Sequence, residues 1–160
     1  MPPQQIIDPS LLDVNNIVST RDDIYALLPH RYEFQRLMGT IYEDRETVTM
    51  AGYYDLPETD FWVRGHIPGR PLFPGVMMIE TAAQLVSYLC LKYSDDSANS
   101  GFLGFSAVDG VKFRGSVTHG QKLIITGRLE DLRPRRIRGY TQGFVDGKMV
   151  YEGMITGMWL

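Results

Sequence analysis

Residues 74–93 read PGVMMIETAAQLVSYLCLKY, and this stretch decides the fold. Proline suits the first position of a helix because it has no N–H group to leave unpaired there, so Pro74 and Gly75 are expected to introduce a helix over residues 76–93. Apolar side chains cover almost every face of this helix. Such a helix must be surrounded by other parts of the protein, which places it at the centre of the fold.

Strand signals dominate the remainder of the chain. Before the long helix, we expect a short helix over residues 20–28 and strands over residues 37–42 and 47–54. After it, strands are expected over residues 102–108, 110–117, 122–132, 136–145 and 149–159, with a hairpin turn at Asp146-Gly147. One buried helix with a mostly antiparallel, strand-rich remainder predicts an α+β fold, in which the sheet curls around the central helix.

The composition is that of one globular domain with a short arm. The chain has 160 residues, of which 44% are hydrophobic and 22% are charged, and its net charge is −3. These values favour a packed core and give no reason to expect nucleic-acid binding. We assign residues 1–19 to a polar N-terminal arm that becomes ordered only where it docks, and residues 20–160 to the domain.

Residue usage also bounds the location of the protein and its need for metals. A single cysteine, Cys90, leaves no internal disulfide and fits a reducing compartment, so we expect a cytoplasmic protein. The most apolar stretch, residues 76–91, is shorter than the roughly 20 residues that a bilayer requires, so no membrane span is expected. The three histidines and the cysteine show no metal-ligand spacing.

A candidate site surrounds the start of the long helix. The preceding segment, residues 55–74, is rich in proline and glycine, and irregular segments of this length usually have a function. His66 lies on this rigid segment, where its ring can be held in place as a base. Glu80 lies in an otherwise apolar helix, where loss of hydration is expected to raise its pKa and make it a proton donor. Unpaired N–H groups around Gly75 and Val76 form a natural oxyanion site.

A base, an acid and an oxyanion binder are the set required to remove water from a β-hydroxyacyl thioester. The base takes the α-proton, the N–H groups stabilise the charge on the thioester oxygen, and the acid protonates the departing hydroxyl. An apolar tunnel around them would hold the acyl chain and exclude competing water. This chemistry needs no metal and no organic cofactor.

Three blocks of the sequence resemble the β-hydroxyacyl-acyl-carrier-protein dehydratases of FabZ type, which have the hot-dog fold. The first block is Leu28-Pro29-His30-Arg31-Tyr32. The second runs from Gly65-His66-Ile67-Pro68 through Pro71 and Pro74-Gly75-Val76 to Glu80 and Ala83-Gln84. The third is residues 105–117, with Val111-Lys112-Phe113-Arg114. The resemblance extends from about Leu27 to the C-terminus, and departs from the family pattern at residues 33–37 and after Arg114.

The resemblance implies a lyase of fatty acid or related lipid biosynthesis, with phosphopantetheine-linked acyl carrier protein as its partner. His66 would take the α-proton, Glu80 would serve the β-hydroxyl, and the Gly75 amide would face the thioester oxygen, with Pro74, Val76 and Gln84 completing the binding site. The resemblance also implies a homodimer in which His66 of one subunit meets Glu80 of the other. Such dimers often assemble further into a trimer of dimers.

Several alternatives stay open at this point. The same fold also serves acyl thioesterases, and a non-catalytic acyl-chain binding protein is a third interpretation. Gln84 either orients the site or satisfies buried backbone groups. His30 is interpreted as a packing residue near the site that does no chemistry.

The basic residues near Arg136 allow two interpretations. They form either a solvated strand edge whose charges discourage aggregation or, with Arg70, Lys112 or Arg114, a docking patch for an acidic carrier protein.

Overall fold

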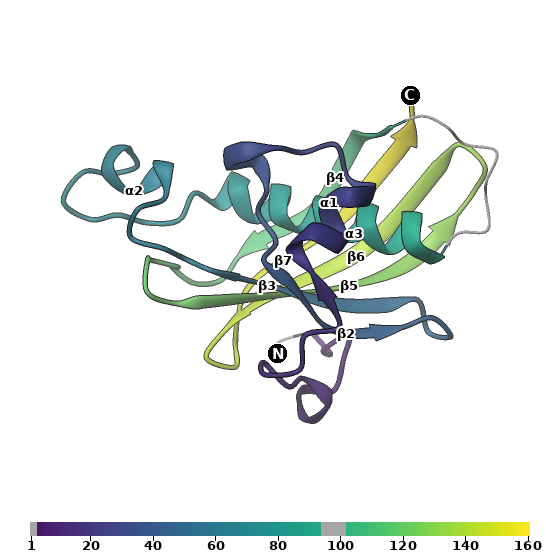
Figure 1. Cartoon of the computed structure of the whole chain (residues 1–160), viewed down its shortest axis with the longest axis horizontal. Helices are drawn as coiled ribbons and strands as arrows, with labels where there is room; N and C mark the ends of the chain where they lie inside the picture. The colour runs from purple at the N-terminus through teal and green to yellow at the C-terminus, as the bar shows by residue number, and fades with distance from the viewer. Residues whose placement is uncertain (1–2, 94–101) are drawn as a thin grey trace.

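The computed structural model describes residues 3–93 and 102–160, which form one antiparallel sheet around one long helix (Figure 1). Seven strands run in the order β1-β2-β3-β5-β6-β7-β4. Their bounds are Ser19–Thr20 (β1), Gly39–Asp44 (β2), Thr49–Asp55 (β3), Leu103–Phe113 (β4), Lys122–Leu132 (β5), Arg136–Val145 (β6) and Lys148–Trp159 (β7). The helices are α1 (Arg21–Leu27), α2 (Phe61–Gly65) and α3 (Gly75–Tyr93). This arrangement confirms the predicted α+β class.

Local sequence signals explain where the elements begin and end. Thr20 caps α1 through a capping box with Asp23, and the helix ends before Pro29. The turn between β6 and β7 has positive φ at both central residues, 50° at Asp146 and 76° at Gly147. This is the geometry of a two-residue type I′ hairpin, which Asp-Gly favours because both residues tolerate that conformation.

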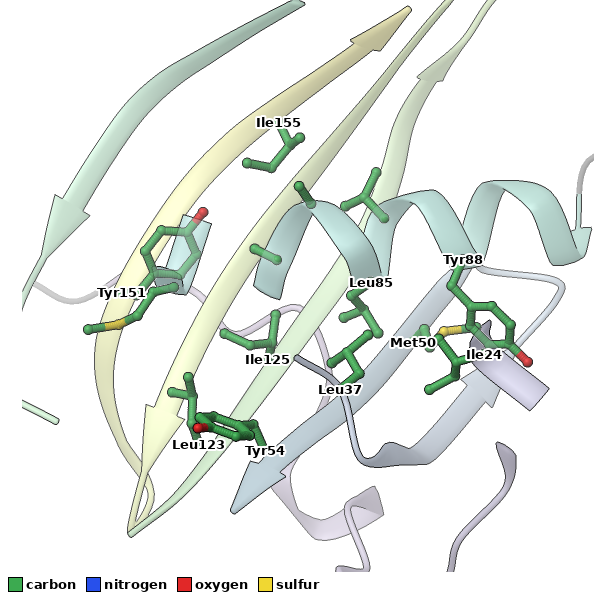
Figure 2. Packing of buried hydrophobic residues seen from close by; sticks show 14 of the residues in the cluster. Ile24, Leu37, Met50, Tyr54, Leu85, Tyr88, Leu123, Ile125, Tyr151 and Ile155 are labelled. Atoms are coloured by element: carbon green, nitrogen blue, oxygen red, sulfur yellow. The ribbon is translucent and has the colours of Figure 1, made fainter. Parts of the chain in front are cut away.

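The core lies between α3 and the face of the sheet that curves around it (Figure 2). Leu85 and Leu89 of α3 are fully buried, as are Leu123 and Ile125 of β5 on the facing strand. The close approach of the helix to the sheet depends on Gly139 of β6, because a Cβ there would lie 2.7 Å from a Val86 methyl group. Burial of these side chains fixes the axis of α3, and with it the position of the residues at its N-terminal end.

Residues 3–18 lie against the outer face of the sheet, on the side opposite α3 (Figure 1). Ile7 is buried there with Ile41 and Ala51. The Gln142 side chain accepts a hydrogen bond from the Ile6 N–H at 2.9 Å and donates one to the Gln4 carbonyl at 2.9 Å. The arm expected to be ordered only on docking is therefore docked on its own domain.

Two expectations differ from the structure. Residues 102–108 and 110–117 were expected as separate strands, but they contribute to one strand, β4, whose pairing with β7 is irregular between Asp109 and Lys112. The segment 55–74 is not wholly irregular, because α2 lies within it. Within residues 3–93 and 102–160, no helix is both long and apolar enough to cross a membrane.

Candidate active site

The N-terminal end of α3 presents unpaired N–H groups, as expected. The Pro74 carbonyl accepts hydrogen bonds from the N–H groups of Met77 (2.9 Å) and Met78 (3.3 Å), so the first turn begins at Gly75. No group in the described part of the chain accepts a hydrogen bond from the N–H of Gly75 or Val76. A Cβ at Gly75 would lie 2.9 Å from the Phe113 ring, so a larger residue there would require this half-exposed ring to move. Val76 is 69% exposed, so the helix start is accessible.

His66 lies directly after α2 and is exposed. Its ring Nδ1 lies 2.6 Å from the Leu72 carbonyl oxygen. Because a carbonyl oxygen can only accept a hydrogen bond, Nδ1 is the protonated nitrogen, and in the neutral ring Nε2 has the lone pair. The ring is thus held in the tautomer that a base requires. Ile67, the next residue, has a φ of 61°, which is rare for a β-branched residue and marks local strain beside His66.

Glu80 lies one turn into α3, and two side chains hold its carboxylate. Its Oε1 accepts a hydrogen bond from Gln84 Nε2 at 2.8 Å and lies 3.4 Å from His30 Nε2. The hydrogen bond from His30 lowers the pKa of Glu80; burial opposes this, and the Gln84 hydrogen bond adds to the lowering. The expectation of a raised pKa was wrong, because donors that stabilise the carboxylate outweigh the loss of hydration.

Gln84 and His30 connect Glu80 to the first sequence block. Gln84 is 1% exposed and fully bonded: it donates to Glu80 and to the Phe34 carbonyl (2.8 Å), and accepts from the Tyr25 hydroxyl (2.7 Å). Gln84 therefore contacts Glu80 and also satisfies a buried backbone group. His30 contacts the carboxylate directly, a closer role than packing near the site.

A pocket of about 60 Å³ opens beside Glu80, between α3 and the strands β4, β6 and β7. Ile137 and Ile155 line its inner end. It shares His30, Ser87 and Leu103 with a second pocket of about 290 Å³ that reaches Leu91 and Phe102. The two pockets together extend from the carboxylate and are lined by both apolar and polar groups.

His66 and Glu80 are not brought together within one chain. In the described residues no hydrogen bond or ion pair joins them, and His66 lines neither pocket. Glu80 also lines a shallow surface depression of about 360 Å³. Its other lining residues are Val76, Ile79 and residues 105–108 of β4. One chain therefore presents the expected base and the expected acid at separate places.

The basic residues expected to dock a carrier protein are spread over the surface. Arg70 is exposed on the loop after His66. Arg114 and Lys112 lie 3.1 Å and 3.8 Å from carboxylate oxygens of Glu152, and Arg136 lies 2.9 Å from Asp131. Three of the four charges are thus partly neutralised by neighbouring acids.

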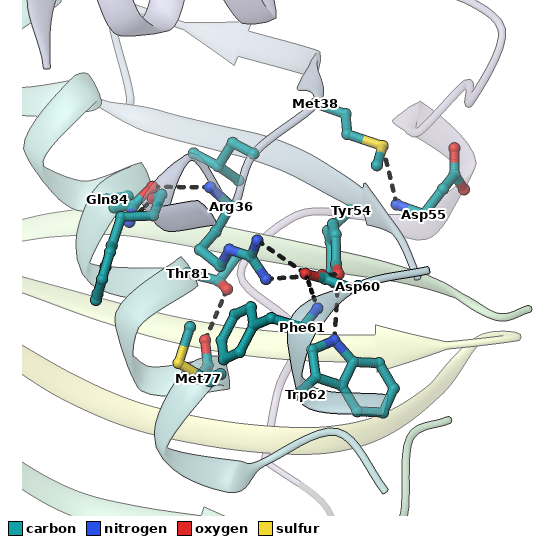
Figure 3. Close-up of polar contacts among 12 residues, drawn as sticks. Arg36, Met38, Tyr54, Asp55, Asp60, Phe61, Trp62, Met77, Thr81 and Gln84 are labelled. Atoms are coloured by element: carbon teal, nitrogen blue, oxygen red, sulfur yellow. Dashed lines mark hydrogen bonds and ion pairs between the residues drawn. The ribbon is translucent and has the colours of Figure 1, made fainter. Parts of the chain in front are cut away.

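Sequence reasoning missed a buried ion pair beside the site, between Arg36 and Asp60 (Figure 3). Their side chains are 5% and 9% exposed, and the closest nitrogen and oxygen lie 2.9 Å apart. The sequence gives little sign of the pair: Arg36 stands between Gln35 and Leu37, and nothing local indicates its partner 24 residues away.

Comparisons with known proteins agree with the resemblance in the sequence. The model of the FabA-like domain matches residues 28–154. The 3-hydroxyacyl-[acyl-carrier-protein] dehydratase FabZ of Polynucleobacter necessarius is 35% identical over 150 residues, which cover 92% of this chain and 93% of that protein. The protein of the same name from Herpetosiphon aurantiacus is 32% identical over 134 residues, covering 84% of this chain and 93% of the relative.

Solved structures confirm the hot-dog fold. The dehydratase heterocomplex ApeI:P from Xenorhabdus doucetiae superposes with a TM-score of 0.72 at 13% identity, covering 86% of this chain and 90% of that chain. The mouse thioesterase superfamily member 2 has a TM-score of 0.63 at 10% identity, covering 86% and 92%. At these identities the likeness concerns the fold alone. The family match extends from the His30 block to β7 and includes the segments that carry both His66 and Glu80, and on this ground the chain belongs to the FabA-like family, as a dehydratase of FabZ type.

Proposed function

We propose that this protein removes water from β-hydroxyacyl thioesters carried by acyl carrier protein, giving trans-2-enoyl thioesters in fatty acid or related lipid biosynthesis. The observation that carries the proposal is the match to the FabZ dehydratases over nearly the whole chain, in a sequence that retains His66, Glu80 and the Gly75 helix start. This makes the enzyme a hydro-lyase.

The reaction uses each group in one role. His66 Nε2, which keeps its lone pair, takes the α-proton. The N–H groups of Gly75 and Val76 donate hydrogen bonds that stabilise the negative charge developing on the thioester oxygen. Glu80 first takes up a proton, which its lowered pKa disfavours, and then donates it to the departing hydroxyl, which leaves as water; the electrons of the C–H bond form the new double bond. Gln84 and His30 hold the carboxylate toward the pocket where the acyl chain lies.

The working unit in this proposal is a homodimer, further assembled as a trimer of dimers. Its support is the free edge of the sheet: β4 is an edge strand, and its Phe105, Val108 and Phe113 are 53%, 43% and 51% exposed. A second copy placed along this edge would cover these side chains and the exposed Val76, and would bring a second His66 loop toward Glu80. The mass in solution, measured by light scattering, tests this; a stable monomer would contradict it.

The proposal also includes the carrier that holds the acyl substrate and the cellular location of the protein. Arg70, which lies nearest in sequence to His66 among the four basic residues, is the first contact we assign to an acidic carrier protein, with Lys112, Arg114 and Arg136 around it. The cytoplasmic location stays a prediction, supported by the reducing environment that a single buried cysteine fits.

The decisive experiment measures conversion of a β-hydroxyacyl thioester to its trans-2-enoyl product, on carrier protein and on coenzyme A. Wild type is expected to turn over the carrier-bound substrate, and His66→Ala to lose this activity. Release of free thiol in place of enoyl product would identify a thioesterase. A folded wild-type protein that binds an acyl thioester without converting it would identify an acyl-chain binding protein.

A further inference from the structure

The Arg36–Asp60 pair has the geometry of a fixed clamp. Arg36 Nη1 and Nη2 donate to the two carboxylate oxygens of Asp60 at 2.9 Å and 3.4 Å, a two-pronged arrangement that fixes orientation as well as distance. The guanidinium carbon also lies 5.2 Å from the centre of the Tyr54 ring and 5.4 Å from that of Phe61. The Tyr54 hydroxyl donates to the same carboxylate. Figure 3 shows the charged pair enclosed by these rings.

Asp60 connects this clamp to His66. Its side chain caps α2 by accepting a hydrogen bond from the Phe61 N–H at 2.8 Å. At the other end of α2, the His66 N–H donates to the Trp62 carbonyl at 2.8 Å. Because α2 has only five residues, the position of its cap determines the position of the histidine that follows it.

Arg36 connects the same clamp to Glu80. Its backbone N–H donates to Gln84 Oε1 at 3.3 Å, and Gln84 in turn donates to Glu80. The side chain of Arg36 therefore holds the loop that carries the base, while its backbone contacts the residue that holds the acid.

Stability alone does not account for this pair. Burying two charges costs solvation that their attraction rarely repays, and apolar replacements of buried ion pairs are often neutral or stabilising. Arg36 Nε is in addition buried without a hydrogen-bond partner in the described residues, which adds to the cost. A pair of this kind is useful where it fixes a geometry.

We infer that Arg36 and Asp60 are positioning residues, which lock the His66 loop onto α3 of the same chain and so fix where His66 is presented to the Glu80 of a second copy. The inference deepens the proposed function and rests on it for its effect on turnover. Neither residue contacts substrate in this role. Removing the clamp lets α2 shift while the core stays intact, and a misplacement of about 1 Å costs roughly 10²-fold in rate.

The test replaces both partners together, Arg36→Met with Asp60→Asn. Asparagine caps a helix as well as aspartate does, so α2 keeps its cap, and no unpaired charge is left buried. We expect kcat to fall about 10²-fold with KM little changed, at a urea midpoint close to that of wild type. The single variant Arg36→Lys is expected to have a kcat between those of the double variant and wild type, because an ammonium group keeps the charge but not the two-pronged geometry.

The control is the ion pair at the opposite end of α3, between Glu43 and Lys92, whose closest atoms lie 2.6 Å apart. Replacing it as Glu43→Gln with Lys92→Met is expected to leave kcat unchanged. A wild-type kcat in the Arg36/Asp60 double variant, or an equal loss of kcat in the control, would overturn the inference.

A second readout does not depend on turnover. The Nδ1 proton of His66, donated to Leu72, is expected to give an NMR signal that is absent from His66→Ala. The Arg36/Asp60 double variant should shift or broaden this signal, and the Glu43/Lys92 control should not. If wild type converts no hydroxyacyl thioester, the proposed function fails, and this signal still decides whether the clamp holds His66; an unchanged signal would exclude it.

Discussion

The two ends of α3 are built for different purposes. At the N-terminal end, Val76 is largely exposed and the first N–H groups have no partner in the described structure. At the C-terminal end, Leu89 and Cys90 are fully buried, and the polar groups bond one another: Lys92 lies 2.6 Å from Glu43, and the Tyr88 hydroxyl donates to Ser19 at 2.9 Å.

This difference separates stability from chemistry along a single helix. A polar group that is satisfied by its neighbours has nothing left to offer a ligand, whereas an unsatisfied one carries a cost that only a ligand or a partner removes. The C-terminal half of α3 therefore fixes the helix in the core. In the function proposed above, the N-terminal half presents groups to a substrate and a second subunit.

The largest expected effect concerns the N-terminal end of α3, where the first N–H groups have no partner in the described structure. Glu80→Gln and His66→Ala should each lower kcat by about 10²–10⁴-fold, because each removes one proton-transfer group. If the site joins two subunits, mixing the two inactive variants under conditions of subunit exchange should restore about a quarter of wild-type activity, since half the dimers then contain one intact site of two. A steady-state assay after mixing measures this.

No recovery in the mixture, with exchange demonstrated by mass spectrometry of differently tagged subunits, would contradict a site shared between chains. The separation of His66 from Glu80 within one chain would then require another explanation.

The next largest effect concerns the buried C-terminal end of α3. Leu89→Ala should lower the free energy of unfolding by about 2–5 kcal/mol, because it leaves a cavity in a fully buried site. Leu160→Ala, the same change at a side chain that is 83% exposed, should alter it by no more than about 0.5 kcal/mol. Urea unfolding followed by circular dichroism measures both, and equal losses would show that burial of Leu89 does not anchor the C-terminal end of α3.

The smallest effect concerns the pKa of Glu80. His30→Phe removes the hydrogen bond that favours the carboxylate, while burial, which favours the neutral acid, remains, so the pKa of Glu80 should rise. In the pH profile of kcat/KM, the limb that disappears in Glu80→Gln should move to higher pH. A limb that stays in place would show that His30 does not control this carboxylate.

The same pKa bears on folding. Because the folded-state pKa of Glu80 is lowered, ionised Glu80 stabilises the protein above its unfolded pKa, and this contribution is lost as the pH falls through the lower, folded value. The His30→Phe variant should therefore lose less stability on acidification than wild type does.

Sequence reasoning succeeded where the determining contacts are local. The start of α3, the start of α1 after Thr20 and the Asp146-Gly147 turn are each encoded by a few adjacent residues. It failed where the contacts are distant. The bond from His30 to Glu80, which reverses the expected pKa shift, joins separate sequence blocks.

The missed helix α2 has a related cause. Five residues within a loop rich in proline give too little periodicity to predict a helix, and α2 packs through Trp62, which is 2% exposed, and the Asp60 ion pair. Similarly, the break expected at residue 109 corresponds to a pairing irregularity between Asp109 and Lys112 within one strand, β4.

The contacts of the N-terminal arm also determine when the outer face of the sheet can be covered during translation. Its hydrogen bonds join Gln4 and Ile6 to Gln142, at sequence separations of 138 and 136 residues. At translation rates of about 5–20 residues per second, the arm leaves the ribosome roughly 7–27 s before its partner does. During this interval Ile7 has no finished sheet to cover. The outer face is therefore completed only when β6 has emerged, although the residues that cover it are made well before that strand.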